Sequence, residues 1–191
     1  MDKIEQIKKI FEESIRVKND FLNDAEGVAV VAEAAEAISG CLKKEGKVLV
    51  FGNGGSAADS QHMAAELMVR FEKERKALPC IALNTNTSNI TAAANDYAFE
   101  GIFSRQIEAL ARPNDIIVAI STSGNSPNVL EAVRTSKEMG IPVIALTGRN
   151  GGKLASLADI SLIVKDGNTA RVQETHILII HALCKLVEEA L

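Results

Sequence analysis

The sequence predicts an α/β fold, a doubly wound parallel sheet flanked by helices, with extra N-terminal helices before it. From residue 47 onward, short runs of apolar and β-branched residues alternate with helical stretches. The runs are nearly continuous in apolar residues, as expected for parallel strands buried on both faces. Polar turns containing glycine follow two of these runs. Sheets of this class usually bind their ligands at such strand ends.

Two helices are expected before the first strand. Residues 2–22 place apolar side chains at helical spacing, opposite lysine, glutamate and aspartate side chains. A second, alanine-rich helical stretch covers about Glu26–Lys44. A minimal α/β sheet does not need both helices. We therefore expect their apolar stripes to cover the sheet in part and to pack against another subunit in part.

The α/β core is expected over about residues 47–191, after leading helices over about residues 1–45. No repeat, low-complexity tract or linker divides the chain, so residues 1–191 are interpreted as one domain. The charged run Phe71–Lys76 is interpreted as a solvated connection. The predicted strands are Lys47–Phe51, Cys80–Leu83, Asp115–Ile120, Pro142–Leu146 and Ile160–Val164. The predicted helices of the core are Ser56–Arg70, Thr87–Ala94, Phe99–Ala109, Ser126–Glu138 and Ala170–Glu189.

The composition is that of a soluble globular protein and argues against several classes of partner. The net charge of the 191 residues is −4 with no compensating basic cluster, which argues against a nucleic-acid partner. No apolar run approaches the roughly 20 residues that cross a bilayer, so no membrane partner is expected. Cys41, Cys80 and Cys184 lie among apolar neighbours without metal or redox spacing. We expect them to fill core positions in the reducing cytoplasm.

The stretch Phe51–Arg70 carries the first candidate site. It turns through Gly52, Asn53, Gly54 and Gly55 directly after a predicted strand, and then becomes helical, with Ser56 as the expected N-cap. The start of a helix presents unpaired backbone N–H groups, which favour an anion. This turn is therefore a candidate ligand-binding loop.

Histidines and carboxamide or carboxylate side chains recur on two of the predicted helices. His62 and Glu66 are four residues apart and project from one helix face. On the last helix, Gln173 and His181 are eight residues apart and lie about 80° apart around the axis, so one site could use both. His176 lies on a different face and is interpreted as structural. The set His62, Glu66, Gln173 and His181 is a plausible nitrogen and oxygen ligand set for an exchangeable or catalytic zinc ion.

The third predicted strand ends in a turn rich in hydroxyl groups, Ser121–Asn125. Ser126 is expected to cap the following helix, with Pro127 in its first position. Hydroxyls and N–H groups then converge at the positive end of a helix dipole, which favours a phosphate. The chain lacks a P-loop lysine and a G-x-G-x-x-G motif, so a nucleotide is not expected. The alternative is a serine-rich turn that only caps its helix.

A further candidate is Asn95 with Asp96, which follow a helical stretch. By themselves these residues are ordinary turn formers.

Five segments together resemble bacterial phosphoheptose isomerases, which are built on the sugar isomerase (SIS) domain. They are GNGGSAADSQHMAAEL, ALNTNTSNITAAANDYAFEGIFSRQI, ISTSGNSPNVLEAV, ALTGRNGG and ARVQETHILIIH. The resemblance covers essentially the whole chain. It implies conversion of sedoheptulose 7-phosphate to D-glycero-D-manno-heptose 7-phosphate, the first step toward ADP-heptose for lipopolysaccharide or surface glycans. It also implies a homotetramer with active sites at subunit contacts and one Zn(2+) in each.

The resemblance assigns roles position by position. The zinc ligands it implies are His62, Glu66, Gln173 and His181. The sugar contacts it implies are Asn53, Gly54, Gly55, Glu66, Asn95, Asp96 and Gln173. The phosphate contacts it implies are Ser121, Thr122, Ser123 and Ser126, with Ser56 lining the same end of the site.

The implied reaction removes a proton from the carbon beside a carbonyl and returns it one carbon over, through an ene-diol(ate). We expect Glu66 to be the base and His181 the acid/base partner, while zinc polarises the sugar oxygens. A zinc-bound carboxylate is less basic, so Glu66 must loosen from the metal during turnover. Ala170 stands where some members carry an aspartate, and Asp166 or Thr169 could take over its contact.

Two other functions are compatible with the same fold. A paralogous adaptor that binds the replication initiator is similar in RFEKERKALPCIALNT and ARVQETH, but it lacks the counterparts of Glu66 and His181. Because this chain has both residues, the sequence favours the isomerase. A sugar-phosphate-sensing SIS module of a regulator ranks last, because no DNA-binding segment precedes the domain in the sequence.

Overall fold

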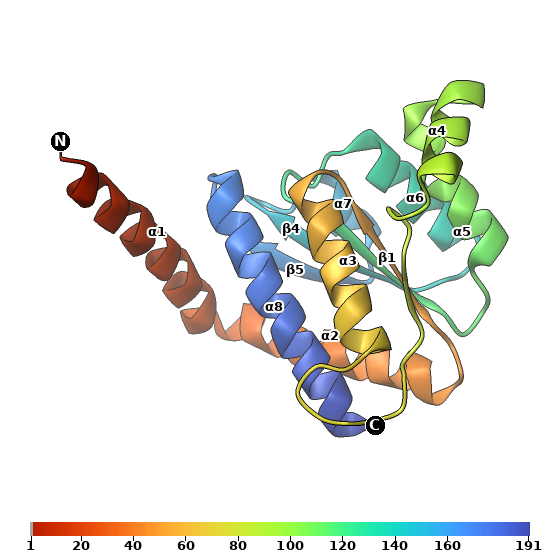
Figure 1. Ribbon diagram of the computed structural model, residues 1–191, viewed down its shortest axis with the longest axis horizontal. Coiled ribbons are helices and arrows are strands. Elements are labelled where there is room, and N and C mark those ends of the chain that lie inside the picture. Colours follow the sequence, from red (N-terminus) through yellow and green to blue (C-terminus); the bar gives the residue numbers. More distant parts are fainter. Residues whose placement is uncertain (1) are drawn as a thin grey trace.

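Five parallel strands form the centre of the computed structural model, which describes residues 2–191 (Figure 1). Their spatial order is β2-β1-β3-β4-β5. The strands are β1 (Val48–Gly52), β2 (Cys80–Ala82), β3 (Ile116–Ser121), β4 (Val143–Gly148) and β5 (Ile160–Val164). All neighbouring pairs run parallel, which confirms the predicted α/β class and all five predicted strands.

Helices cover both faces of the sheet, and each face has its own core. Alternate residues of a strand point to opposite faces. Val48 and Val50 accordingly pack with the helices of one face, and Leu49 and Phe51 with those of the other. The first face carries α2 (Ala25–Lys43), α3 (Gly55–Met68) and α8 (Thr169–Ala190). The second face carries α5 (Ser104–Leu110), α6 (Pro127–Glu138) and α7 (Gly152–Leu157).

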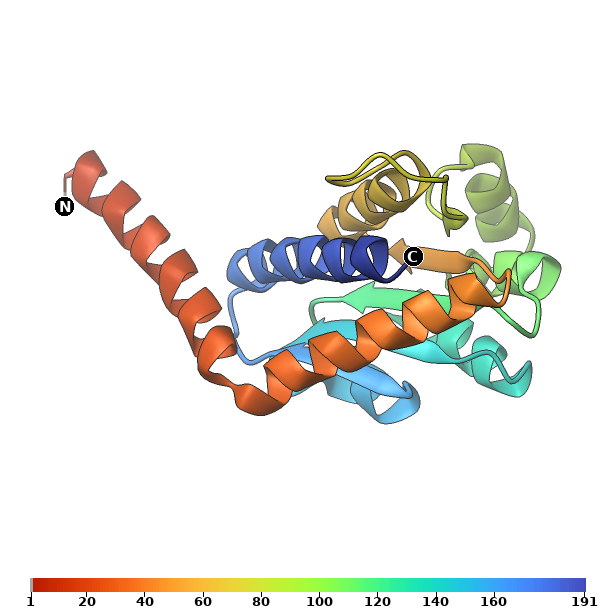
Figure 2. The same cartoon turned by 90° about the horizontal axis from the view of Figure 1, so that it is seen from below.

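The first helix, α1 (Lys3–Asn23), leaves the body of the molecule as an arm (Figure 2). Its polar side is tied to the start of α8. Ser14 Oγ donates to Glu174 at 2.6 Å, and Arg16 pairs with Asp166 at 2.8 Å. Val17 is buried in the core of the first face and Phe21 packs against it. Six large apolar side chains of α1 are instead 50–67% exposed and do not cover the sheet: Ile4, Ile7, Ile10, Phe11, Ile15 and Leu22. Only the C-terminal end of the α1 stripe therefore joins the core over the sheet, whereas the α2 stripe covers it.

The structure differs from the predicted helices in two places. The predicted helix Phe99–Ala109 is divided into a 3-10 turn, η1 (Phe99–Gly101), and α5. The helix α7 was not predicted, because it has only six residues and begins with a glycine. That residue, Gly152, has a φ of 57°, which glycine adopts readily but which is not a helical value. The remaining helix, α4 (Thr87–Asp96), matches its prediction and extends to include Asn95 and Asp96.

The charged run Phe71–Lys76 is also more ordered than expected. It is held by the carboxylate of Glu188, whose side chain is 1% exposed, so it is not a simple solvated connection. The three cysteines are buried, as predicted, and each is a free thiol. Within residues 2–191, no helix combines the length and apolar character required to span a membrane.

The strand order defines where a ligand can enter. The chain leaves β1 toward β2 on one side and reaches β3 on the other, so the connections diverge between β1 and β3. In open α/β sheets the ligand crevice lies at this switch point, outside the carboxyl ends of the strands. The two polar turns predicted to bind ligand follow β1 and β3, and the fold therefore brings them together.

Gly52 ends β1 at this switch point, where no side chain fits. A Cβ there would lie 2.7 Å from the Ser56 Cβ and 2.8 Å from the Ile120 carbonyl oxygen. We expect Gly52→Ala to lower the free energy of unfolding by about 1–3 kcal/mol, because it overpacks the β1–β3 junction. Urea unfolding measures this change.

The matched control is Gly40→Ala within α2, where a Cβ meets no atom within 4 Å. This variant should gain about 0.5–1 kcal/mol from helix propensity. Equal stability of the two variants would contradict the close approach at Gly52.

Candidate functional site

An amide pair joins the two strand ends across the switch point. Asn53 Nδ2 donates to Asn128 Oδ1 at 2.8 Å, and Asn128 Nδ2 donates back to Asn53 Oδ1 at 2.9 Å. Asn128 lies in the first turn of α6 and is 1% exposed. Sequence reasoning missed Asn128, although a polar residue directly after a helix-starting proline was a usable signal. The pair fixes the orientation of Asn53, a predicted sugar contact.

The turn after β3 gathers hydroxyl groups at the start of α6. Ser121 Oγ lies 3.0 Å from Ser126 Oγ and 3.5 Å from Ser123 Oγ. Ser126 is the N-cap residue and Pro127 the first helical residue, as predicted, but the Ser126 hydroxyl makes no capping hydrogen bond. It lies within hydrogen-bond distance of the Ser121 hydroxyl instead. Phosphate binding by these residues and Thr122 stays a prediction.

The turn after β1 differs from its prediction in one respect. Gly54, with a φ of 55°, is the N-cap of α3, whereas Ser56 lies inside the helix and is buried. The expected capping role of Ser56 is therefore wrong. Gly55 packs against α8, because a Cβ there would lie only 2.2 Å from Gln173 Nε2. Glycine at this position brings Gln173 to the ligand turn.

Three predicted reactive side chains meet where α3 and α8 lie side by side (Figure 1). His62 Nε2 is 2.9 Å from His181 Nε2 and 3.2 Å from Glu66 Oε1. The Glu66 side chain is 22% exposed and the His62 side chain 44%, so substrate can reach both. A carboxylate in contact with one imidazole, which in turn contacts a second, can accept and pass on protons.

The same three side chains suit zinc in their donor chemistry. Two imidazole nitrogens and a carboxylate oxygen are common zinc ligands, and donors around one zinc ion lie roughly 3.3 Å apart. Within residues 2–191, no three His, Cys, Asp or Glu side chains are already arranged as a metal site. Gln173 lies roughly 12 Å from His181 along α8. Its role as a fourth ligand stays a prediction.

Asp59 is a further buried group beside this cluster, and sequence reasoning missed it. It precedes His62 by one turn on α3 and is 6% exposed. Its Oδ2 has no hydrogen-bond partner within the described chain. Burial raises the pKa of Asp59 to about 6, against the opposing charge effect of His62. With Gln173 and Glu174 it lines a cavity of about 280 Å³.

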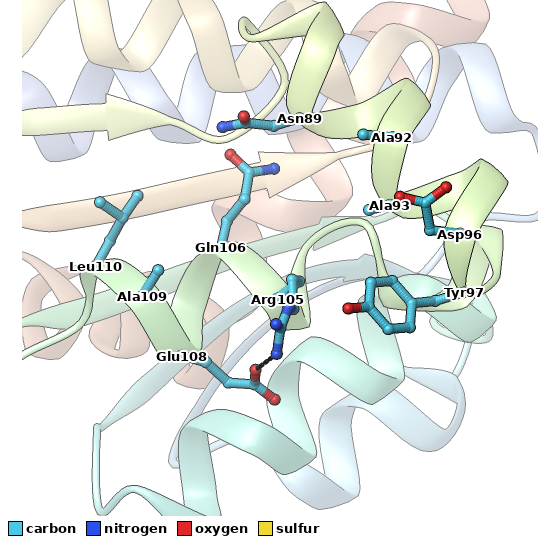
Figure 3. Close-up of a pocket in the computed structure, with 10 residues that line it drawn as sticks. All are labelled: Asn89, Ala92, Ala93, Asp96, Tyr97, Arg105, Gln106, Glu108, Ala109 and Leu110. Atoms are coloured by element: carbon cyan, nitrogen blue, oxygen red, sulfur yellow. Dashed lines mark hydrogen bonds and ion pairs between the residues drawn. The ribbon is translucent and has the colours of Figure 1, made fainter.

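Asn95 and Asp96 are both exposed in the last turn of α4, where Asn95 Nδ2 donates to Asp96 Oδ1 at 2.8 Å. Within residues 2–191, neither forms a hydrogen bond to the Asn53 turn. Asp96 lines a cavity of about 580 Å³ between α4 and α5 (Figure 3). There Arg105 bonds Glu108 at 3.0 Å and lies 5.3 Å from the Tyr97 ring centre. This cavity contains none of the three histidines.

Comparison with known proteins shows the family to which the chain belongs. The SIS domain family matches residues 8–148 of the chain. Phosphoheptose isomerase from Campylobacter jejuni is 55% identical over 159 residues, which cover 83% of this chain and 86% of that protein. The phosphoheptose isomerase of Aquifex aeolicus is 52% identical over 186 residues, which cover 97% of this chain and 96% of that protein. The chain belongs to the phosphoheptose isomerase family.

A solved structure supports the same relationship. Phosphoheptose isomerase from Neisseria gonorrhoeae superposes with a TM-score of 0.92 at 46% identity, covering 98% of this chain and 100% of that one. Membership in the phosphoheptose isomerase family is confirmed over nearly the full length. The alternative of a non-catalytic adaptor for the replication initiator is not favoured.

His176, the third histidine, lies in the core, as the sequence analysis expected. Its ring is fully buried, and its Nε2 lies 3.0 Å from the Thr147 carbonyl oxygen at the end of β4. Burial lowers the pKa of His176 to about 4. The residue is therefore neutral at physiological pH and is not a member of the reactive cluster.

This burial makes stability depend on pH in a definite direction. Between pH 6.5 and 4, a histidine in the unfolded chain binds a proton that folded His176 does not, so acidification favours unfolding. We expect wild type to lose up to about 3 kcal/mol more than His176→Gln over this range, at about 1.4 kcal/mol per pH unit. Asp59 acts in the opposite direction but is present in both proteins. Urea midpoints at pH 7 and 4.5 measure the difference, and equal losses would contradict it.

Proposed function

We propose that this chain isomerises sedoheptulose 7-phosphate to D-glycero-D-manno-heptose 7-phosphate. The observation that carries the proposal is the contact of His62 with both Glu66 and His181, at 3.2 and 2.9 Å. An aldose–ketose isomerase needs a base for a carbon-bound proton and a second group that moves protons between oxygens. The chain supplies both at one point between α3 and α8.

In the proposed reaction, the Glu66 carboxylate removes the proton from the carbon beside the carbonyl. An ene-diol(ate) forms, and Glu66 returns the proton to the neighbouring carbon. His181 donates a proton to one oxygen as it accepts one from the other, so no net proton is lost. The partial burial of Glu66 limits the access of water, which would otherwise exchange the transferred proton.

The phosphate group would bind in the turn at the carboxyl end of β3. The hydroxyls of Ser121, Ser123 and Ser126 lie together at the positive end of α6, where a dianion is favoured. Asn53 lies across the switch point, held by Asn128, and would receive the sugar hydroxyls between the phosphate turn and Glu66. The remaining predicted contacts are Gly54, Gly55, Ser56, Asn95, Asp96, Thr122 and Gln173.

Zinc is proposed as the cofactor, held by His62, Glu66 and His181, with Gln173 as the predicted fourth ligand. When bound, it supplies a Lewis acid that polarises the sugar oxygens. Glu66 is both a proposed ligand and the proposed base, so its carboxylate must share the metal loosely. Its position near the end of α3, where its side chain is partly exposed, leaves it room to move.

A homotetramer in the cytoplasm, serving ADP-heptose synthesis for lipopolysaccharide or surface glycans, is proposed with the activity. The exposed apolar side chains of α1 support a subunit contact, because burial of large apolar groups drives association. Where some family members carry an aspartate, Ala170 is exposed at the start of α8. Nearby Asp166 is occupied by Arg16 and the Asn168 N–H.

A proton NMR time course with sedoheptulose 7-phosphate tests the activity. Wild type should form the aldose heptose 7-phosphate, whereas Glu66→Gln should lose at least about a thousandfold in kcat, because an amide cannot accept the carbon proton. Glu33→Gln, an exposed change on α2, is the matched control and should keep full activity. Full turnover by Glu66→Gln would eliminate Glu66 as the base, and no turnover by folded wild type would eliminate the isomerase.

Metal removal tests the cofactor separately. Chelator-treated protein should lose most of its turnover and regain it with zinc, and direct metal analysis should find one zinc ion per chain. His62→Gln should hold less than wild type because it removes a central donor. Undiminished activity after complete chelation would refute a catalytic zinc. Unchanged zinc content in Gln173→Ala would restrict the ligand set to the other three residues.

A further inference from the structure

A buried ion pair lies behind the reactive cluster, at the opposite end of α3 and α8 from the ligand turns. Glu188, in the last turns of α8, accepts four hydrogen bonds. Its Oε1 accepts from Phe71 N at 3.1 Å and from Arg75 Nε at 3.2 Å. Its Oε2 accepts from Glu72 N at 2.9 Å and from Lys73 N at 2.8 Å. Burial alone would raise the pKa of Glu188, but these donors outweigh it and lower the pKa.

The partner guanidinium reaches the helix that carries the proposed base. Arg75 Nη2 donates to the backbone carbonyl of Glu66 at 2.8 Å, and Nη1 donates to that of Leu67 at 2.8 Å. The last carbonyls of a helix have no partner inside the helix, so a cation at that end satisfies and stabilises them. Arg75 therefore fixes the turn of α3 from which the Glu66 side chain extends.

The same segment touches the other reactive residue through Phe71. The Phe71 ring centre lies 5.7 Å from that of His181, and the His62 ring centre lies 5.1 Å from that of His181. The His181 imidazole is thus in contact with Phe71 as well as with His62. The N–H of Phe71 is one of the groups held by Glu188, so the ring position depends on that carboxylate.

We propose that Glu188 and Arg75 are positioning residues for the reaction, acting through the α3 end and through Phe71. The pair sets the position of Glu66 on α3 and that of His181 on α8 relative to each other, without contacting substrate. Only the expected effect on kcat rests on the proposed function. Its structural part, the link from Glu188 to the His181 ring, is measurable in a protein of any activity.

Glu188→Gln tests the link, with Glu189→Gln as the matched control. Glu189 is the next residue, exposed on the same helix, and its variant makes the same change in charge. The amide introduced by Glu188→Gln would present an N–H₂ group to N–H donors, which disrupts two of the four bonds. We expect Glu188→Gln to lower kcat about tenfold with KM within twofold, and Glu189→Gln to change neither. Arg75→Lys keeps the charge but loses the planar set of guanidinium donors, so its kcat should lie between those of Glu188→Gln and Glu189→Gln.

NMR of the imidazole rings distinguishes a local change at His181 from a general loss of stability, which would also change the signals of His176. The chain has three histidines, so each ring can be assigned from single variants. With metal content matched in all samples, Glu188→Gln should shift the His181 ring signals and leave buried His176 unchanged. Phe71→Leu should shift the same His181 signals through loss of the aromatic ring, and this arm remains if Glu188→Gln does not fold.

The outcomes separate the two proposals. A His181 shift without isomerase activity in wild type would uphold the link and remove the proposed function. Isomerase activity in wild type, with unchanged kcat and unchanged His181 signals in folded Glu188→Gln, would overturn the positioning role. Equal shifts of His176 and His181 would also overturn it, because they would indicate general loosening of α8.

Discussion

The direct pairing of β1 with β3 is the constraint on which the rest of this molecule depends. Because the two strands are neighbours and parallel, their carboxyl ends meet, and the turns that follow them cannot lie elsewhere. The reciprocal amide bonds of Asn53 and Asn128 then lock the two turns together. Each turn opens a helix, and so both helix dipoles present their positive ends to one crevice.

The packing of α3 against α8 provides the second half of the site. Both helices start near the ligand turns and lie side by side on the same face of the sheet, so they share one seam (Figure 1). Gln173 meets Gly55 at the beginning of this seam, and His181 meets His62 further along it. Glu188 closes the far end by holding the segment after α3. The predicted ligand contact, the histidine pair and the carboxylate that holds the following segment therefore lie in sequence along one helix pair.

The sequence predicted those features that repeat along the chain or follow from local chemistry. The strands are runs of apolar residues, and all five were found, because burial on both faces leaves no other pattern. The histidine and glutamate pair was visible because residues four apart on a helix project from the same face. Ser56 was assigned to the cap because serine is favoured there, whereas the chain uses Gly54. Glycine is also accepted at an N-cap and at positive φ, and local preference does not decide between the two positions.

The remaining features depend on distant contacts. Asp59 has no signal in the sequence that separates it from an ordinary polar helix residue, and the burial of Asn128 also follows only from the fold. The bonds between Glu188 and the residues after α3 join positions more than a hundred residues apart, which a single sequence does not encode as a pattern. The arm-like direction of α1 is set by contacts with Asp166 and Glu174. Its apolar spacing alone cannot distinguish a stripe that faces the sheet from one that faces outward.

The three buried cysteines can report local unfolding of the protein through the reactivity of their thiols. Burial raises the pKa of Cys41 to about 11 and that of Cys184 to about 12, and it raises that of Cys80 further. Only the thiolate reacts with alkylating reagents, so in the closed fold these sulfurs are nearly inert at neutral pH. Cys80 lies on β2 at the sheet edge, Cys41 on α2 and Cys184 on α8. The rate at which each thiol becomes modified therefore reports how often its own element separates from the body of the protein.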